Sequence, residues 1–257
     1  MWYSIYGDIM LIDTHCHLCN NDYEDLDKVI KNMNGIMIAN GCDDKTNKEV
    51  LKLTKKYPNV YGCLGIHPSE INSITDDSFK IIEENINNTK IVGIGEIGLD
   101  YYWVKDNKDK QKEIFKKQLD IAKKYNKPIV VHSRESIQDV YEILKEYKLK
   151  GTIHCFSSSL EMAKNFIKLG YKIGVGGVIT FKNSKKLEEV VNGIDVTNIL
   201  IETDSPYLSP EPFRGRTNEP SNVLYVAKKI AELKNQTLEE IITITGNNAI
   251  NEFDLMI

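Results

Sequence analysis

The sequence is short of arginine and carries no excess of positive charge. Its 257 residues include 33 lysines and arginines, of which only three are arginines, and the formal net charge is -4. A protein that holds long nucleic acid through a broadly basic surface needs an excess of positive charge. The composition argues against such a surface, so an anionic substrate would have to be bound by a local positive centre.

Cysteines are few and odd in number, and long apolar runs are absent. The five cysteines (Cys16, Cys19, Cys42, Cys63 and Cys155) follow no secretory signal, so we predict a reducing compartment, the cytoplasm, and no disulfide framework. The C-x-x-C of Cys16 and Cys19 lacks the second pair that a zinc knuckle needs, and we interpret it as two buried apolar residues. No segment approaches a membrane span, so no membrane association is expected.

The chain contains no Pro/Ser-rich linker, charge block or low-complexity tract, which predicts one domain over residues 1–257. The first clear strand begins near Met10. Residues 1–9 are therefore expected to form a flexible extension, and either Met1 or Met10 could be the natural start.

Apolar, β-rich runs alternate with amphipathic helical segments along the whole chain. Near-continuous apolar strands are typical of parallel sheets, and eight β-then-α units in about 250 residues are typical of a closed barrel. We predict an α/β fold, a TIM-type (β/α)8 barrel with an extra C-terminal helix; an open doubly wound sheet is the alternative. The predicted strands are residues 9–18, 35–41, 60–68, 90–100, 128–134, 151–156, 171–180 and 198–208.

Histidines gather at the carboxyl ends of these strands. In "LIDTHCHL" (11–18), strand periodicity points His15 and His17 the same way and Cys16 the opposite way. Two exposed histidines at a strand end are the alternative interpretation of this motif alone. However, all five histidines of the chain lie at strand ends, where barrel enzymes build their active sites. They are His15, His17, His67, His132 and His154.

Two carboxylates join the histidines. Glu96 ends the fourth predicted strand and Asp204 ends the eighth, whereas we interpret Asp100 and Glu202 as turn or cap residues. Glu202 shares the parity of Asp204, so a side chain that faces the barrel mouth is the alternative for it. Nitrogen and oxygen ligands without a thiolate pair suit Zn²⁺, Mn²⁺, Fe²⁺ or Mg²⁺. Six candidate ligands exceed what one catalytic ion needs, so we predict two bridged ions, an arrangement suited to hydrolysing phosphoesters.

The three arginines fit an anionic substrate. Arg134 follows His132 by two residues, so it shares the same strand face and can grip a phosphate. Arg214 and Arg216 lie in a loop after the eighth strand, where barrel loops often line phosphate sites. We predict Arg214 as a further phosphate contact; plain solvent exposure is the alternative for both loop arginines.

The motifs "IDTHCHL", "GIHP", "GEIGLDYY", "VVHSR", "IHCFS", "ETDSPYL" and "RGRTNEPSN" resemble, in this order, those of the TatD family of metal-dependent deoxyribonucleases, within the amidohydrolase superfamily. The resemblance implies that Asp204 orients or deprotonates the hydrolytic water. It also implies that DNA is trimmed from the 3′ side. The implied ligands of one ion are His15, His17, Glu96 and Asp204, and those of the second are the bridging Glu96, His132 and His154.

His67 lies beyond this ligand set, and we hypothesise that it contacts the scissile phosphate together with Arg134. Many amide hydrolases of the superfamily carry a bridging lysine on the fourth strand. This chain has Glu96 there, which favours the nuclease branch.

The predicted cofactors are two divalent ions per chain (Mg, Mn or Zn), and the predicted substrates are DNA ends or single-stranded oligonucleotides. Aromatic residues are available to stack bases: Tyr101, Tyr102, Trp103 and Tyr207. A monomer without an obligate protein partner is expected. One alternative is a metal-dependent ester or amide hydrolase such as a D-aminoacyl-tRNA deacylase. Another is a non-catalytic metal-binding scaffold.

Overall fold

The computed structural model describes residues 10–257, and the predictions about residues 1–9 lie outside them. Eight strands form one sheet, in which each strand pairs in parallel with the next along the chain. They are β1 (Leu11–Cys16), β2 (Gly35–Asn40), β3 (Val60–Leu64), β4 (Ile91–Asp100), β5 (Ile129–Arg134), β6 (Gly151–Ile153), β7 (Lys172–Val175) and β8 (Ile199–Ile201).

The chain after β8 closes this sheet onto β1. The Thr14 hydroxyl donates to the Ile201 carbonyl at 3.0 Å, and the amide of Asp204 donates to the His15 carbonyl at 2.9 Å. The amide of His17 donates to the Ser205 carbonyl at 2.7 Å. The predicted (β/α)8 barrel is thus confirmed, and the open-sheet alternative is wrong.

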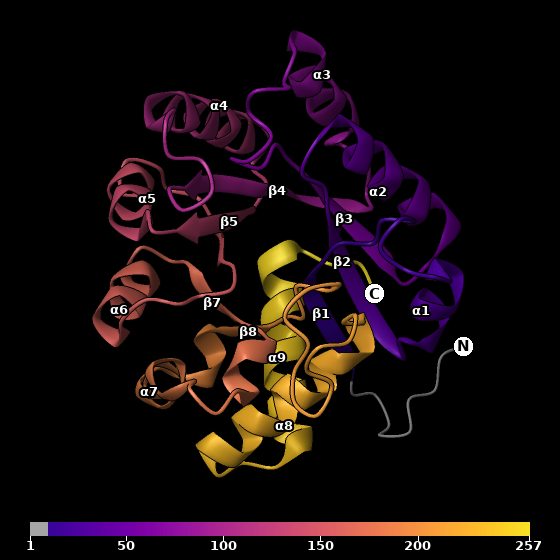
Figure 1. Cartoon of the computed structure of the whole chain (residues 1–257), viewed down its shortest axis with the longest axis vertical. Helices are drawn as coiled ribbons and strands as arrows, with labels where there is room; N and C mark the ends of the chain where they lie inside the picture. Colours follow the sequence, from indigo (N-terminus) through magenta and orange to yellow (C-terminus); the bar gives the residue numbers. More distant parts are fainter. Residues whose placement is uncertain (1–9) are drawn as a thin grey trace.

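Helices surround the strands in a ring (Figure 1). No helix among the described residues is long and apolar enough to cross a membrane. The helices are α1 (Leu26–Asn32), α2 (Asp44–Lys56), α3 (Asp76–Asn85), α4 (Lys108–Tyr125), α5 (Ile137–Leu144), α6 (Leu160–Lys168), α7 (Lys185–Gly193), α8 (Val223–Lys234) and α9 (Leu238–Phe253), with short 3-10 turns at Gly177–Thr180, Val196–Asn198 and Pro220–Asn222.

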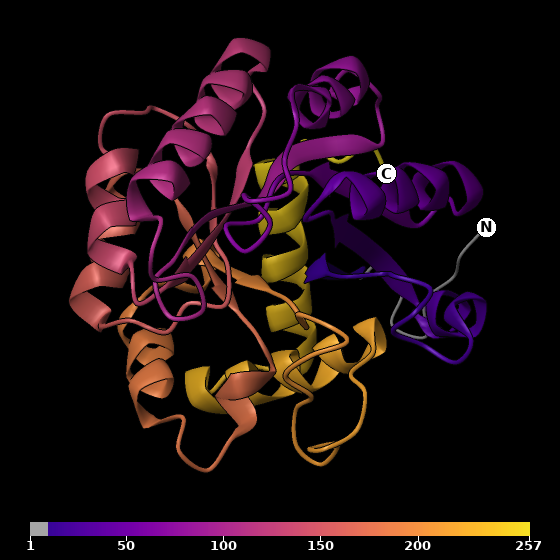
Figure 2. The same cartoon turned by 45° about the horizontal axis from the view of Figure 1, so that its top comes forward.

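The extra C-terminal helix α9 covers the amino end of the barrel, and Figure 2 shows it near the middle of the ring of helices. Apolar residues near the starts of six strands form one buried cluster with Ala249 and Phe253 of α9. Burying this layer contributes roughly 25 cal/mol per Å² of apolar surface removed from water. The strand residues are Ile12, Ile36, Ile38, Tyr61, Cys63, Val92, Val130 and Leu200.

Local sequence explains where several helices begin and end. α2 starts with a capping box, in which the side chains of Asp43 and Thr46 each accept a backbone amide of the other. α9 starts with the same device between Thr237 and Glu240. α4 ends at Asn126, whose left-handed backbone (φ 51°) terminates the helix.

The last three strands are shorter than predicted. β6 ends at Ile153 because the chain turns at Cys155, whose φ is 42°. β7 is followed by a 3-10 turn at Gly177–Thr180, and β8 ends before a turn at Asp204, whose φ is 55°. Apolar composition alone could not separate these turns from the strands they follow.

A bulge in β1 sets the direction of its histidines. Between Asp13 and Cys16, β1 holds one residue more than the facing segment of β2. Ile12 and His15 therefore both point into the barrel, although residues three apart on an unbroken strand face opposite ways. The bulge lets one strand supply an apolar residue to the closed end and imidazoles to the open end.

Glu252 of α9 gives a stability test. It is buried beside the amino end of β6, where burial raises the pKa of its carboxyl to about 7. An acid with a raised folded-state pKa stabilises the fold below its unfolded pKa, and this contribution is lost as pH rises through the folded pKa. We predict that Glu252→Gln raises the free energy of unfolding above that of the parent protein. This increase should be about 2 kcal/mol larger at about pH 8.5 than at about pH 5.5.

Denaturant unfolding at both pH values measures this difference. The matched control is Glu239→Gln, which changes an exposed glutamate on the same helix and should show no such pH dependence. Equal effects of the two substitutions would contradict the assignment.

Candidate active site

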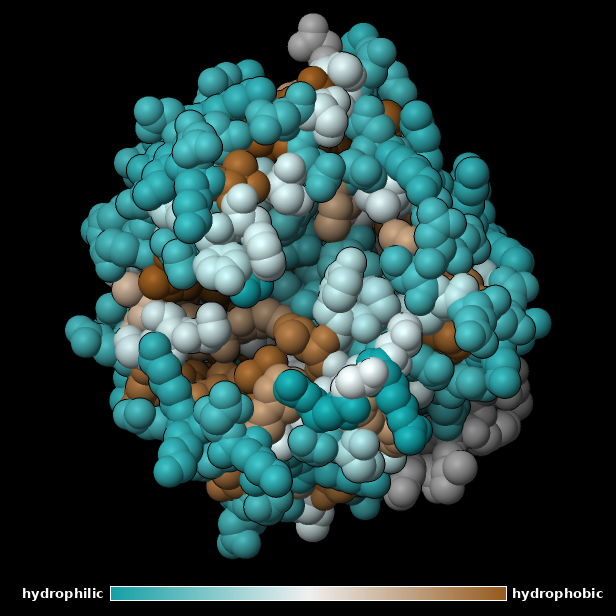
Figure 3. Space-filling model, viewed as in Figure 1, coloured by the Kyte–Doolittle hydropathy of each residue, from teal (hydrophilic) through white to brown (hydrophobic). Residues whose placement is uncertain are grey.

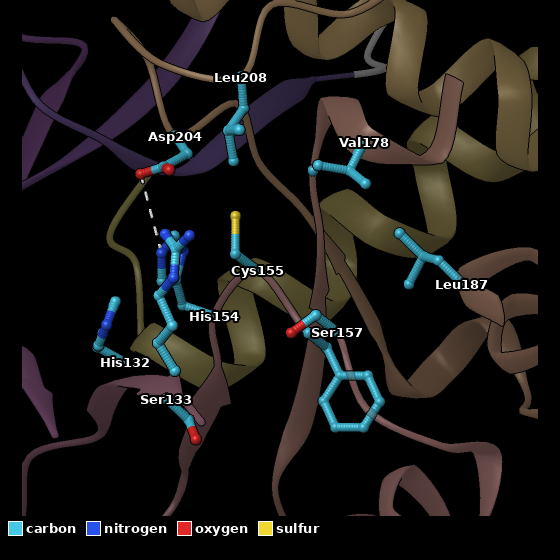
Figure 4. Close-up of a pocket in the computed structure, with 12 residues that line it drawn as sticks. His132, Ser133, His154, Cys155, Ser157, Val178, Leu187, Asp204 and Leu208 are labelled. Atoms are coloured by element: carbon cyan, nitrogen blue, oxygen red, sulfur yellow. Dashed lines mark ion pairs between the residues drawn. The ribbon is translucent and has the colours of Figure 1, made fainter. Parts of the chain in front are cut away.

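The structure brings the six residues predicted as metal ligands together at the open end of the barrel. Figure 3 shows a hollow at the middle of this face. In Figure 4, Asp204 lies opposite His154, with Oδ1 and Nε2 3.8 Å apart, and His132 lies nearby. The six come from β1, β4, β5 and the turns after β1, β6 and β8, so closure of the barrel is what assembles the site.

Glu96 lies between two pairs of imidazoles, and each of its carboxylate oxygens faces one pair. Oε2 is 3.4 Å from His15 Nε2 and 3.5 Å from His17 Nε2. Oε1 is 2.8 Å from His132 Nδ1 and 3.5 Å from His154 Nε2. This division matches the two ligand sets implied by the family resemblance, with Glu96 shared between them.

A local irregularity of β4 places Glu96 there. Between Ile94 and Ile97, β4 holds one residue more than β5, which turns the Glu96 side chain into the barrel. The neighbouring Gly95 packs so closely on β5 that an added Cβ would lie 2.6 Å from the Val130 Cβ. Only glycine fits at that position without moving the two strands apart.

His17 points its Nε2 at the centre of the site. Its Nδ1 lies 3.1 Å from the carbonyl of Asn40, which can only accept, so Nδ1 carries a proton. Nε2 then lies 3.2 Å from His15 Nε2 and 3.4 Å from Asp204 Oδ1. Nearby acidic groups raise the pKa of His17 despite its burial, so Nε2 also binds a proton in the metal-free protein, and a divalent cation would take the place of that proton.

Two carboxylates orient the second pair of imidazoles in the same manner. Glu202 is fully buried, and its Oε1 lies 3.1 Å from His154 Nδ1. Asp100 Oδ2 lies 3.0 Å from His132 Nε2. His132 Nδ1 also lies 2.8 Å from Glu96 Oε1, so this ring contacts a carboxylate at each nitrogen. The acidic neighbours raise the pKa of His132 and of His154 despite burial, and a divalent cation would take the place of the protons on His132 Nδ1 and His154 Nε2. Metal-binding histidines are typically held by such a carboxylate on the other ring nitrogen.

The sequence-based interpretation of these two carboxylates needs correction. Asp100 does stabilise a turn, since its Oδ1 accepts the amides of Tyr102 at 2.9 Å and Trp103 at 2.8 Å. It also contacts His132, which the turn interpretation missed. For Glu202 the structure favours the alternative that its parity with Asp204 offered, because its side chain is buried inside the barrel and contacts His154.

The donor set fits a divalent cation. Four imidazole nitrogens converge on two carboxylates, and the donor atoms of His15, His17 and Glu96 lie within 4.8 Å of one another. The same holds for His15, His154 and Asp204. Among residues 10–257, no such close group contains both His132 and His154, although each contacts the same oxygen of Glu96.

Both central carboxylates are held in the ionised form. Burial raises the pKa of Glu96, but the surrounding imidazoles, with His154 first and a hydrogen bond from His132, outweigh it and bring the pKa well below its usual range. Burial likewise raises the pKa of Asp204, and His154 and His17 more than compensate, so the pKa is lowered. Two carboxylates and several imidazole nitrogens are the ligand types that divalent metal ions take.

His67 faces the same centre with a hydrogen-bond donor. Its Nδ1 accepts the backbone amide of Ser69 at 3.1 Å, so Nε2 carries the proton of the neutral ring. Nε2 lies 3.7 Å from Glu96 Oε1. Burial lowers the pKa of His67 to about 3, which keeps the ring uncharged. The protonated nitrogen points into the site, as expected of a residue that binds an anionic oxygen.

The other predicted phosphate contacts fall in different places. Arg134 lines a pocket of about 310 Å³ together with His132, His154 and Asp204. Arg214 instead lies with its guanidinium 3.7 Å from the centre of the Phe181 ring, and it lines none of the pockets described in residues 10–257. The structure therefore brings Arg134 to the centre and does not bring Arg214 there.

A model of the family described as TatD related DNase matches residues 12–254. The chain belongs to the TatD family. The resemblance recognised from the motifs is thus confirmed over nearly the whole sequence.

Comparison with similar proteins indicates the general class of activity of this TatD-family member. It is 43% identical over 248 residues to YabD of Bacillus subtilis (strain 168), described as an uncharacterized metal-dependent hydrolase, with 93% of this chain and 97% of YabD covered. The crystal structure of YjjV, a TatD homolog from Escherichia coli K12, superimposes with a TM-score of 0.89 at 30% identity and covers 96% of this chain and 98% of YjjV. This TatD-family protein is a metal-dependent hydrolase.

An amidohydrolase from Saccharomyces cerevisiae shares the fold at 19% identity. Its TM-score is 0.79, and the match covers 95% of this chain and all of the yeast chain, at 100%. The yeast structure thus has the same barrel fold that the sequence predicted for this chain.

Glu202 offers a test of how the site is held. Removing its carboxylate in Glu202→Ala frees the proton on His154 to change nitrogens, so we expect divalent-metal affinity to fall about 10- to 100-fold. Calorimetric titration of the metal-free protein with Mn²⁺ measures the change.

The conservative Glu202→Gln variant keeps an oxygen acceptor and should retain most of the affinity. Glu84→Gln, at an exposed position on α3, serves as the control. Unchanged Mn²⁺ affinity in Glu202→Ala would show that Glu202 does not act through His154.

Proposed function

We propose that this TatD-family hydrolase cleaves phosphodiester bonds as a 3′-to-5′ exodeoxyribonuclease acting on DNA ends or single strands. One observation carries the proposal: both oxygens of Glu96 face imidazole pairs, while the protonated Nε2 of His67 points at the same centre. A site that combines two sets of metal donors with a neutral anion donor suits a phosphodiester.

Two divalent ions (Mg, Mn or Zn) would be held by the two donor sets. His15, His17, Glu96 and Asp204 would hold one, and Glu96, His132 and His154 the other. Such ions supply Lewis acidity that lowers the pKa of water and neutralises charge on the phosphate. The acidic chain can then accept a polyanion without a broadly basic surface.

The protein's own groups complete the reaction. Asp204, ionised and at the edge of both donor sets, accepts a proton from the attacking water. The Nε2–H of His67 donates to a non-bridging phosphate oxygen, and the Arg134 guanidinium binds the phosphate from the β5 side. The water oxygen bonds to phosphorus, the bond from phosphorus to O3′ of the upstream nucleotide breaks, and O3′ takes a proton.

Exposed aromatics beside Arg134 support a single-stranded substrate. The Arg134 guanidinium lies 4.4 Å from the centre of the Tyr102 ring and 5.5 Å from that of Trp103. Trp103 is 69% exposed and Tyr207 is 58% exposed, so both can stack on bases. Tyr101, also named as available for stacking from the sequence, is instead buried and donates its hydroxyl to Asp139 at 2.6 Å, which is the packing role that such aromatics more commonly have.

A 5′-labelled single-stranded oligonucleotide tests the proposed function. Protein stripped by chelator and reloaded with Mg²⁺, Mn²⁺ or Zn²⁺ should shorten the strand from its 3′ end, as seen on a denaturing gel. Asp204→Asn should lose at least about 100-fold in rate, in line with the removal of a general base.

Intact DNA with every ion, in protein that nevertheless binds metal, would overturn the nuclease proposal. Hydrolysis of aminoacyl esters such as D-aminoacyl-tRNA would then be measured as the second candidate. A monomer located in the cytoplasm remains the expected state of the protein.

His67 separates substrate binding from metal binding. His67→Ala should keep the metal content of the parent and lose about 100- to 1,000-fold in turnover, as when one oxyanion donor is removed. Metal analysis and oligonucleotide kinetics on the same preparation give both values.

His67→Gln places an N–H donor near the position of Nε2 and should recover part of the turnover. Loss of metal in His67→Ala would instead move His67 into the ligand set, where its close grouping with Glu96 and His132 would place it.

A further inference from the structure

The two pockets beside the metal donors differ in charge. The pocket on the β1–β3 side has a volume of about 410 Å³ and includes His17, His67 and Glu96 in its wall. The pocket on the β5–β8 side, about 310 Å³, includes His132, His154 and Asp204. Both pockets thus open onto the same centre, one on each side of it.

The β1–β3 pocket is acidic. Asp22, Asp43, Glu49 and Glu70 line it together with one lysine, Lys45. In the described part of the chain, none of the four carboxylates forms an ion pair with a lysine or arginine. Their charge therefore acts on whatever enters the pocket.

Glu49 and Tyr207 add two independent observations. Glu49 lines the pocket, and its Oε2 has no hydrogen-bond partner among residues 10–257, which leaves this acceptor unsatisfied by the protein itself. Tyr207 reaches the same pocket from the chain after β8, and its largely exposed ring can stack on a base. A nucleoside offers hydroxyl donors to the carboxylates of this pocket and a planar base to the Tyr207 ring.

The opposite side has balanced charge and apolar surface. Arg134 and Asp204 line the β5–β8 pocket, and Lys186 and Glu135 line an adjoining one of about 260 Å³. Val178, Leu187 and Leu208 face the pocket in Figure 4, and Figure 3 shows apolar surface on the side of α6 and α7. A polyanionic strand therefore meets less repulsion on this side, where Arg134 can bind a phosphate, than in the acidic β1–β3 pocket.

We infer, resting on the proposed nuclease function, that the β1–β3 pocket takes the 3′-terminal nucleoside and that its carboxylates exclude any further phosphate. The upstream strand lies over Arg134, with its scissile phosphate at the metal donors. A 3′-terminal nucleoside ending in a hydroxyl carries no charge beyond that phosphate, so it enters the acidic pocket. A 3′-phosphorylated end or an internal segment would bring a phosphate against the carboxylates.

In this arrangement, repulsion of any phosphate beyond the scissile one restricts cleavage to the 3′-terminal nucleotide. Cleavage adds the water oxygen to phosphorus and releases O3′ of the upstream strand, so the terminal nucleotide leaves as a 5′-monophosphate. The upstream strand then ends in a new 3′-hydroxyl, which meets the same requirement. Asp22, Glu49 and Glu70 are thus specificity-determining residues.

Matched oligonucleotides test the inference. Parent protein loaded with its most active ion is given one sequence ending in a 3′-hydroxyl, in a 3′-phosphate, or closed into a single-stranded circle. We expect the 3′-hydroxyl strand to be cut at least about tenfold faster than either of the others at low salt, with the ratio falling as salt screens the carboxylates. Equal rates on the hydroxyl and phosphate ends would overturn the inference while leaving the nuclease function intact.

The triple variant Asp22→Asn/Glu49→Gln/Glu70→Gln keeps the shape of the pocket and removes three charges. Asp43 is left in place because its side chain caps α2. The ratio of hydroxyl-end to phosphate-end cutting should fall to about threefold or less, since the repulsion is electrostatic. The readout is a ratio within one protein, so a change in overall rate cancels.

The control triple Glu84→Gln/Glu161→Gln/Glu239→Gln makes the same charge change at exposed positions outside the pocket and should keep the parent ratio. An unchanged ratio in the pocket variant would overturn the inference. Failure of the parent to cut any of the three substrates would overturn the proposed function, and this inference with it.

Discussion

The Glu96 carboxylate is the contact on which the rest of the site depends. Its two oxygens face His15 and His17 on one side and His132 and His154 on the other, so one side chain joins contributions from four strands. Such a carboxylate is stable when buried only if positive charge or donors surround it. In the metal-free protein the facing imidazoles meet this need by binding protons, since the pKa values of His17, His132 and His154 are raised, and a divalent cation would take the place of those protons.

The barrel is built to hold that carboxylate in place. An extra residue in β1 and another in β4 turn His15 and Glu96 inward, and Gly95 lets β4 pack closely against β5. At the other end, α9 fills the barrel with apolar side chains. A site on rigid strands above a packed floor keeps ligand positions fixed, whereas the loops above it remain free to set substrate preference.

Much of this could be predicted from the sequence, because strand periodicity and the clustering of histidines at strand ends depend on local pattern. The barrel, the eight strands and the six candidate ligands followed from that pattern. The bulges could not be predicted, since they are properties of pairing between strands. The contacts of Asp100 and Glu202 with histidines also depend on distant segments, 32 and 48 residues apart in the chain. The sequence also could not show which aromatic side chains are exposed, since Tyr101 proves to be buried.

The most direct test of the account is the number of divalent ions that the protein binds. Titration of metal-free protein with Mn²⁺, followed by calorimetry and by metal analysis after gel filtration, should give two ions per chain. A His132→Asn/His154→Asn variant that unfolds at the parent temperature should give one, because only the Oε2 side of Glu96 keeps its imidazoles. A single ion in the parent, or two in the variant, would contradict the role of Glu96 as a bridge between two metal sites.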